Sequence, residues 1–158
     1  MIPPMIDSYL REHRLRFEHH IHRRVIPAQR LAAAEHVAGG RVAKVVVVSV
    51  DDALALAVVP APAHVDPVAL CQCLGAREVK VVPEDSFADR FWPCEVGAEP
   101  PLSLFGVPIY VDASLARQPR LLMRGGTHED AIRMRTDEWM DVENVRVVQG
   151  LGRVDFQH

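Results

Sequence analysis

The sequence is poor in cysteine, in long apolar runs and in excess charge of either sign. Three cysteines in 158 residues are too few for a disulfide framework, and no apolar run approaches the ~20 residues that a membrane-spanning helix needs. A formal net charge of −3 argues against a broad surface for nucleic-acid phosphates, so any RNA contact must be local. The N-terminal residues show no signal-peptide pattern, and we expect a cytoplasmic protein.

The cysteines are also poorly placed to act together. Cys71 and Cys73 lie two residues apart in a predicted helix, which directs their side chains to nearly opposite sides. Cys94 stands alone after Trp92-Pro93. A buried structural thiol is the favoured interpretation of Cys94, and a nucleophile with a histidine partner is the alternative. We expect no metal and no other cofactor.

The chain is 49% hydrophobic and 25% charged, which is ordinary for a globular protein. Without a repeat or a long linker, we expect one domain over residues 1–158, with a core at about 6–150 and fraying after about Leu151. Periodicity and turn residues predict helices and strands in alternation. The expected helices lie at 6–13, 28–36, 66–74 and 84–91, with a further helix capped by Thr136; the expected strands lie at 16–22, 45–50, 53–59, 79–82, 107–111, 120–124 and 131–135.

Lys44 is the most informative single residue. It precedes the apolar run Val45–Val50, which predicts a strand buried on at least one face. Asp51-Asp52 then predicts a hairpin turn, which leaves Lys44 at the open end of the hairpin. An ammonium there must reach water, a counter-charge or a ligand. A lysine that merely extends to solvent is the alternative interpretation.

Two loops offer chemistry that fits Lys44. One is the Gly-x-x-x-Pro turn at Gly97–Pro101, and the other is Gly125–His128. Glycine lets a backbone approach a ligand closely, proline stiffens a turn, and lysine supplies charge for an ester carbonyl or a phosphate. Each loop alone is more often just a turn. Together they predict a site that acts by positioning and polarisation.

Four segments resemble the YbaK and prolyl-tRNA synthetase editing-domain family: 41–47, 94–101, 106–112 and 126–134. Their order and spacing are more specific than any one segment, and the resemblance covers nearly the whole chain. It implies an α+β fold in which a curved, mixed, barrel-like sheet, flanked by short helices, surrounds a small pocket. Lys44 and the loop Gly97–Pro101 would line that pocket.

The resemblance also implies a function: trans-editing hydrolysis of the ester of mischarged aminoacyl-tRNA, with Cys- or Ala-tRNA(Pro)-like substrates. Lys44 would be catalytic and hold the terminal nucleotide or the ester, while a neighbouring ribose hydroxyl helps to activate water. The implied substrate-binding residues are Gly97, Ala98, Pro101, Gly126, Thr127 and His128. The expected partner is the 3' end of aminoacylated tRNA, with a synthetase as a further candidate. We expect no DNA or membrane partner, and both a monomer and a homodimer remain open.

The chain departs from the family pattern at three places. Val45 follows the lysine where many relatives carry a small hydroxyl residue, and Leu102-Ser103 follows Pro101 where an aromatic or small residue and glycine are common. Glu99 replaces a usually apolar or small residue, and a carboxylate near a phosphate weakens its binding. The alternative function is therefore a catalytically weak or inactive module of the same fold that binds tRNA or a synthetase. A Schiff base on Lys44 is less favoured, because no phosphate-cradling loop is recognisable.

The histidines at 19, 20 and 22 form a second cluster. On a strand, His20 and His22 share a face. A solvated strand face is the favoured interpretation, and contact with RNA or a metal are the alternatives. No third metal ligand is evident from the sequence.

Overall fold

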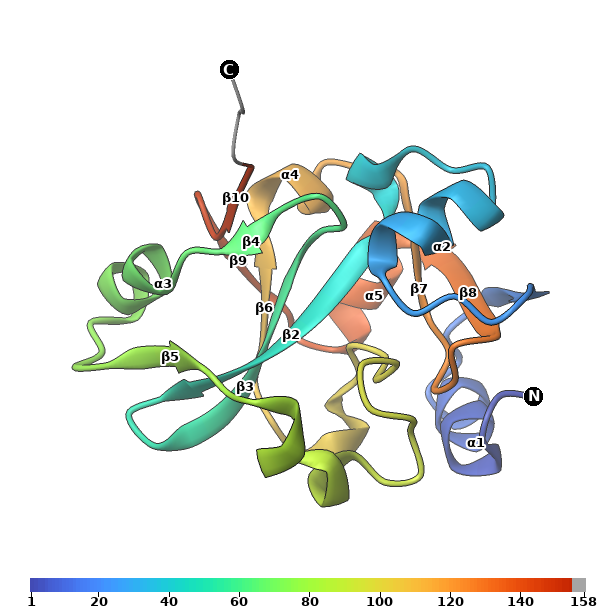
Figure 1. Cartoon of the computed structure of the whole chain (residues 1–158), viewed down its shortest axis with the longest axis horizontal. Coiled ribbons are helices and arrows are strands. Elements are labelled where there is room, and N and C mark those ends of the chain that lie inside the picture. The colour runs from blue at the N-terminus through green and yellow to red at the C-terminus, as the bar shows by residue number, and fades with distance from the viewer. Residues whose placement is uncertain (155–158) are drawn as a thin grey trace.

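Short helices surround β-sheets in the computed structural model, which describes residues 1–154 (Figure 1). The helices are α1 (Pro4–Glu12), α2 (Ala28–Ala34), α3 (Pro67–Leu74), α4 (Ala113–Ala116) and α5 (Thr136–Val142). The strands are β1 (Phe17–Ile21), β2 (Ala43–Val50), β3 (Ala53–Pro60), β4 (His64–Val65), β5 (Val79–Val81), β6 (Ile109–Asp112), β7 (Arg120–Arg124), β8 (Asp130–Arg135), β9 (Arg146–Val148) and β10 (Gly152–Arg153). Short 3-10 helices occur at Gly39–Arg41, Glu84–Ser86, Ala88–Phe91 and Ser103–Phe105.

The predicted hairpin of β2 and β3 is confirmed, and it forms the centre of the larger sheet. The two strands pair antiparallel along their whole length. Asp51 and Asp52 form the turn with φ angles of 47° and 69°, left-handed values that aspartate tolerates and that suit a two-residue hairpin turn. The strand order is β5-β2-β3-β6-β9. Because β6 is parallel to β3 and β9 is parallel to β6, this sheet is mixed.

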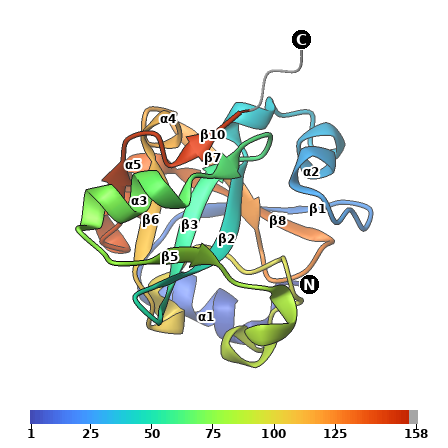
Figure 2. The ribbon, with the colours of Figure 1, turned by 60° about the vertical axis from the view of Figure 1, so that its left-hand side comes forward.

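A second sheet, β1-β8-β7, lies beside the N-terminal part of β2 (Figures 1 and 2). A parallel bridge between Val42 and Leu122 connects the two sheets. The predicted α+β class, a mixed sheet flanked by short helices, is confirmed. Within residues 1–154 the strands do not close into a barrel.

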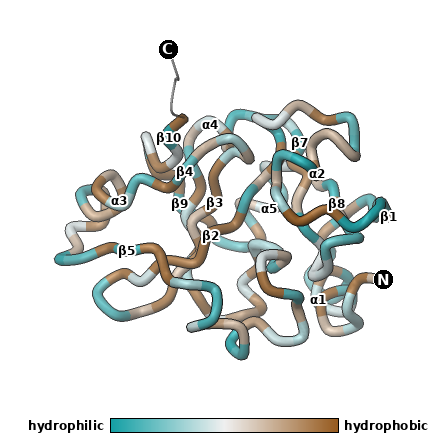
Figure 3. Tube along the Cα trace, viewed as in Figure 1, coloured by the Kyte–Doolittle hydropathy of each residue, from teal (hydrophilic) through white to brown (hydrophobic). Residues whose placement is uncertain are grey.

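The two faces of β2 pack against different cores. Ala43 and Val47 belong to the main core, which includes residues of α1 and β7. Val48 belongs to a second core with Leu70 of α3. This division follows from the alternation of side chains along a strand, and the apolar central strands stand out in brown in Figure 3. Lys44 has the parity of Val48, so its side chain leaves β2 on the face of the second core.

Two local predictions differ from the structure. The segment predicted as one helix through Phe91 forms two 3-10 helices, with Phe87 between them at φ −130° and ψ 1°. Such short turns are common connectors. Thr136 is not the cap of α5, because Arg135 occupies that position and makes no side-chain hydrogen bond to the helix.

The chain continues as a strand after Leu151, where fraying was predicted. Gly152 and Arg153 form β10 and pair with β4, so the predicted fraying after Leu151 is wrong for these residues. Residues 155–158, to which that prediction also applied, lie outside the described part of the chain. No helix within residues 1–154 is both long enough and apolar enough to cross a membrane.

Candidate active site

A cavity of about 370 Å³ lies along the open edge of β2. On this edge β5 pairs only with Val48–Val50, and the Val47 carbonyl accepts a hydrogen bond of 3.0 Å from the Val82 amide. Backbone groups of alternate residues face the same edge of a strand, so the amide and carbonyl of Val45 also face the cavity. The gap between β5 and the bridge to β7 therefore exposes strand backbone inside a pocket.

Apolar side chains form most of the walls of this cavity, and five ionisable residues join them. The apolar lining includes Leu31, Val45, Val47, Phe87 and Val96, and the ionisable residues are Lys44, Glu84, Glu99, Arg124 and His128. Residues of both charge signs therefore border the cavity. The interaction between two charges is stronger where water is excluded, because the effective dielectric constant is lower there.

Lys44 lines the cavity, yet its ammonium also has a partner within the protein. The Nζ atom donates a hydrogen bond to the carbonyl of Ala63, which belongs to the second core. Burial lowers the pKa of Lys44 below its ordinary value. An ammonium has three protons, so the bond to Ala63 leaves two for a ligand.

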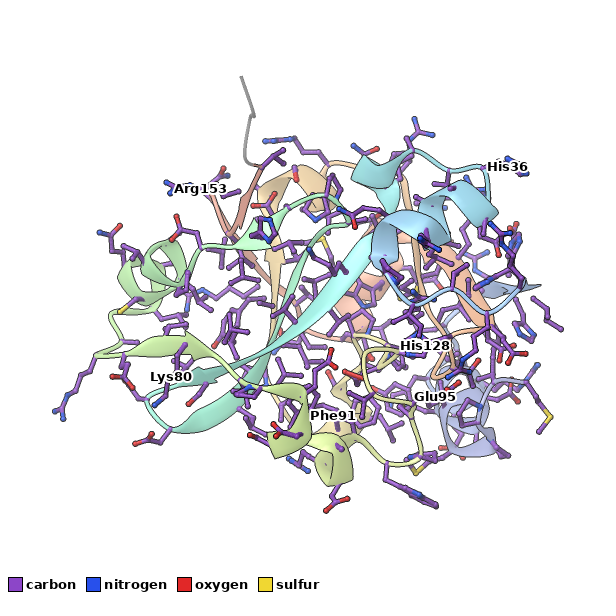
Figure 4. All side chains as sticks on the ribbon, in the orientation of Figure 1. His36, Lys80, Phe91, Glu95, His128 and Arg153 are labelled. Atoms are coloured by element: carbon purple, nitrogen blue, oxygen red, sulfur yellow. The ribbon has the colours of Figure 1, made fainter. Side chains whose placement is uncertain are left out.

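The two glycine-containing loops are joined by backbone and side-chain hydrogen bonds. The Glu95 amide donates to the Gly126 carbonyl at 2.9 Å, and the Gly126 amide donates to the Ala98 carbonyl at 3.0 Å. The carboxylate of Glu95 accepts from the His128 amide at 3.1 Å. Figure 4 shows Glu95 and His128 side by side. These bonds place Gly97 and His128 together at one wall of the cavity.

His128 is held in one orientation. Its side chain is 3% exposed, and Nε2 lies 2.9 Å from the Val96 carbonyl. A carbonyl can only accept, so Nε2 carries the proton and Nδ1 is the acceptor nitrogen. Nδ1 is buried without a hydrogen-bond partner. His128 therefore keeps one ring nitrogen without a partner, on an imidazole whose Cε1 and Nε2 atoms lie beside Gly97.

Arg124 is a cavity residue that the sequence reasoning missed. It ends β7, is 5% exposed, and donates from Nη2 to the Ile26 carbonyl at 2.5 Å. Its Nη1 atom is buried and has no hydrogen-bond partner. Burial lowers the pKa of Arg124 to about 10, and Glu95 opposes that change. One signal was available, since strand alternation places Arg124 on the same face as the buried Leu122.

Glu99 also lies in the cavity wall, where sequence reasoning had treated it only as a departure from the family. Its side chain is 2% exposed, and Oε2 has no hydrogen-bond partner. Burial raises the pKa of Glu99, and the backbone amides of Glu99, Gly97 and Ala98 oppose the rise. The backbone of the predicted substrate-binding residues Gly97 and Ala98 thus lies near a carboxyl group of the protein itself.

The remaining site candidates do not line the cavity and instead support its walls. Ala98 is fully buried, and the Pro101 carbonyl accepts a hydrogen bond of 2.8 Å from the Trp139 indole. Gly126 packs against Pro3 of the chain entering α1. The Thr127 hydroxyl donates to the Asp130 carboxylate at 2.5 Å. Their contacts position the two loops.

The surroundings of Cys94, His19 and His20 bear on the nucleophile and metal alternatives. Burial raises the pKa of the Cys94 thiol to about 12, which disfavours the thiolate that a nucleophile requires. His19 lies 2.6 Å from Asp130, and His20 contacts the carboxylates of Glu18 and Glu35. Within residues 1–154, no three histidine, cysteine or acidic side chains gather as a metal site would require.

Comparison with known proteins shows the family of the chain. The aminoacyl-tRNA editing domain model matches residues 22–142, and the chain belongs to that family. No curated protein sequence matches the chain.

Solved structures show the same fold at low sequence identity. Hypothetical protein APE2540 superposes with a TM-score of 0.84 at 15% identity, over 94% of this chain and 99% of that one. A structure described as "a putative trans-editing enzyme for prolyl tRNA synthetase" gives 0.77 at 18% identity, over 94% and 98% of the two chains. A "putative signal transduction protein" from Marinobacter aquaeolei VT8 gives 0.71 at 17% identity, over 98% of this chain but 31% of that one. The fold thus occurs both alone and as part of a longer chain.

Proposed function

We propose that the chain hydrolyses the ester bond of mischarged aminoacyl-tRNA in trans, with alanyl- or cysteinyl-tRNA for proline as the substrate class. One observation supports this most: Lys44, Gly97 and His128 line a single cavity in a chain of the editing-domain family. The proposed partner is the 3' end of the aminoacylated tRNA, and the proposed location is the cytoplasm. The proposed domain is the whole chain.

The proposed reaction needs little acid-base chemistry from the protein. The oxygen of a water attacks the ester carbonyl carbon, the bond to the ribose oxygen breaks, and that oxygen takes a proton. A neighbouring ribose hydroxyl helps to activate the water. The residues of this chain hold the reacting groups and stabilise the negative charge on the carbonyl oxygen.

Lys44, Gly97 and His128 each have a role in the proposal, and four further residues support them. The two remaining protons of Lys44 bind the terminal nucleotide or the ester oxygen. Nδ1 of His128 accepts a hydrogen bond from the water or the ribose, beside the open backbone of Gly97. The two loops are held in position by the hydrogen bonds described above, which involve Ala98, Pro101, Gly126 and Thr127.

The walls provide the selectivity. Val45, Val47 and Phe87 give an apolar surface within a cavity of about 370 Å³. A synthetase site excludes an amino acid smaller by one methylene only weakly, by ~1–3 kcal/mol. A second small pocket can therefore remove esters that a proline site accepts in error.

Single-turnover hydrolysis tests the proposal. Alanyl-, cysteinyl- and prolyl-tRNA for proline are each mixed with excess protein, with a protein-free control, and free amino acid and intact tRNA are measured. We expect the alanyl or the cysteinyl ester to be hydrolysed well above the rate of the protein-free control. The prolyl ester should be hydrolysed at the rate of that control. Binding of the aminoacyl-tRNA without hydrolysis of either ester would contradict the proposal and favour a binding module.

A further inference from the structure

Glu99 is a buried acid without a counter-charge in the cavity wall. Only 2% of its surface is exposed, and Oε2 has no hydrogen-bond partner. A carboxylate taken out of water is costly unless a cation or hydrogen-bond donors compensate it. Glu99 forms no ion pair within residues 1–154. The backbone amides of Glu99, Gly97 and Ala98 offset part of the cost of burial, but they carry no positive charge, so the surroundings of the unpaired Oε2 suit a positively charged ligand group.

A second carboxylate increases this preference. Glu84 lines the same cavity, and Oε1 of Glu84 lies 3.7 Å from the position that a Cβ of Gly97 would take. Its negative charge contributes to the raised pKa of Glu99. Glu84 also has no ion pair in the described part of the chain. Two unpaired acids thus flank Gly97.

The cations of the cavity do not neutralise these acids. The Lys44 ammonium donates to the carbonyl of Ala63. The negative charge of Glu95 raises the pKa of Arg124, whereas the negative charge of Glu84 raises the pKa of Glu99. The charge of the cavity is therefore divided, with an acidic part at Glu84 and Glu99 and a basic part at Arg124.

We propose that Glu99, assisted by Glu84, binds the α-ammonium group of the aminoacyl moiety. This inference rests on the proposed deacylase function and assigns one end of its substrate. An aminoacyl ester carries its ammonium one carbon from the carbonyl under attack. Binding of the ammonium at Glu99 therefore holds that carbonyl beside Gly97 and His128. The acidic part at Glu99 and Glu84 then recognises the amine.

The test compares alanyl-tRNA with lactyl-tRNA, in which a hydroxyl replaces the ammonium on an otherwise similar ester. Single-turnover rates are divided by the protein-free rates, and the alanyl-to-lactyl ratio is the amine preference. We expect a preference of at least ~10-fold for the wild type, as one charged hydrogen bond provides. Glu99→Gln is expected to slow the alanyl ester by ~10-fold or more and to leave the lactyl ester nearly unchanged.

Two further variants keep the test independent of folding at the buried position. Glu84→Gln changes an exposed side chain and is expected to lower the amine preference by about 2- to 5-fold. Glu12→Gln, at an exposed position of α1, is the matched control and is expected to leave the preference at the wild-type value.

The outcomes separate this inference from the proposed function. Wild-type protein that hydrolyses both esters without preference, or a Glu99→Gln variant that slows both equally, would overturn ammonium binding and leave the deacylase in place. An unchanged preference in Glu84→Gln would overturn the assistance by Glu84. Wild-type protein that hydrolyses neither ester would overturn the deacylase proposal, and the assignment of Glu99 with it.

Discussion

A side chain at Gly97 would touch the imidazole of His128. A Cβ built there would lie 3.5 Å from Cε1 and 3.9 Å from Nε2. The φ angle of Gly97 is 85°, a value that residues with a Cβ rarely adopt. Glycine is therefore favoured here by the backbone of the turn, and it leaves the space beside His128 in the cavity wall open.

Gly97→Ala should lose activity beyond its cost in stability. The positive φ angle costs about 1–2 kcal/mol for a residue with a Cβ, and the methyl group would also occupy the space beside the His128 ring that the proposed substrate enters. Denaturant unfolding and single-turnover hydrolysis measure the two effects. Gly75→Ala is the matched control, because Gly75 also has a positive φ of 65° but has open space around it. Equal loss of activity in both variants would contradict a role for Gly97 in the site.

Gly126→Ala should destabilise the fold severely. A Cβ there would lie 2.8 Å from Cδ of Pro3 and 2.9 Å from Cδ1 of Ile6, and the φ angle is 97°. Overpacking and backbone strain together predict a loss of about 3 kcal/mol or more in unfolding free energy. Gly40→Ala, where no atom lies within 4 Å, should stay within about 1 kcal/mol of the wild type. A Gly126→Ala variant as stable as the control would refute the packing described for this loop.

Arg124→Met should separate activity from stability. Removing a buried charge with an unpaired Nη1 costs little, so the unfolding free energy should change by less than about 1 kcal/mol. We propose that the unpaired Nη1 donates a hydrogen bond to the substrate, and loss of this bond should reduce the hydrolysis rate by ~10-fold or more. Arg120→Met, at the exposed start of the same strand, is the control. Wild-type hydrolysis by Arg124→Met would exclude Arg124 from the site.

Asp130 should make the fold sensitive to acid. Burial alone would raise its pKa, but hydrogen bonds from the Met1 amino group, Thr127 and His19 outweigh burial, and the pKa is lowered. Near that pKa the folded state then binds fewer protons than the unfolded state, so the contribution of Asp130 to stability is fully present above the ordinary aspartate pKa. It is lost as the pH falls through the lower, folded pKa.

Asp130→Asn tests this dependence by urea unfolding between neutral pH and about pH 3, near the ordinary aspartate pKa. The variant should be less stable at neutral pH by about 2–4 kcal/mol, because it removes a buried charge that is hydrogen-bonded. Its stability should also fall less steeply with acid. Asp137→Asn changes an exposed carboxylate and serves as the control. A steeper acid dependence in Asp130→Asn would contradict the lowered pKa.

Elements with strong local signals were predictable from the sequence. The Asp51-Asp52 turn between two apolar runs predicted the hairpin, and Asp66 and Gly75 bounded α3 as its N-cap and left-handed C-cap. The prediction of one helix over residues 84–91 was wrong. Phe87 and Phe91 both pack in the main core, and this packing outweighs the helix preference of the segment. Local preference decides an element only where tertiary contacts do not oppose it.

The site could be predicted only in part. Lys44, Gly97 and His128 were predicted because charge, glycine and loop chemistry are visible in sequence, and all three line the cavity. The bond from Lys44 to Ala63 and the approach of Arg124 to the cavity depend on the junction of two sheets, which no local pattern encodes. Glu99 was noticed, but its burial beside Glu84 could only come from the structure.

Lys44 gives the most direct test of the account. It is one of two lysines in the sequence, and the other, Lys80, is exposed on β5 and pairs with Glu78 at 3.1 Å. Lys80→Ala is therefore the matched control. The measurement is single-turnover hydrolysis of alanyl- and cysteinyl-tRNA for proline by the wild type and by both variants. We predict a loss of ~100-fold or more in Lys44→Ala, the usual cost of removing one electrostatic stabiliser, and wild-type rates in Lys80→Ala. A folded Lys44→Ala variant that hydrolyses these esters at the wild-type rate would contradict the account.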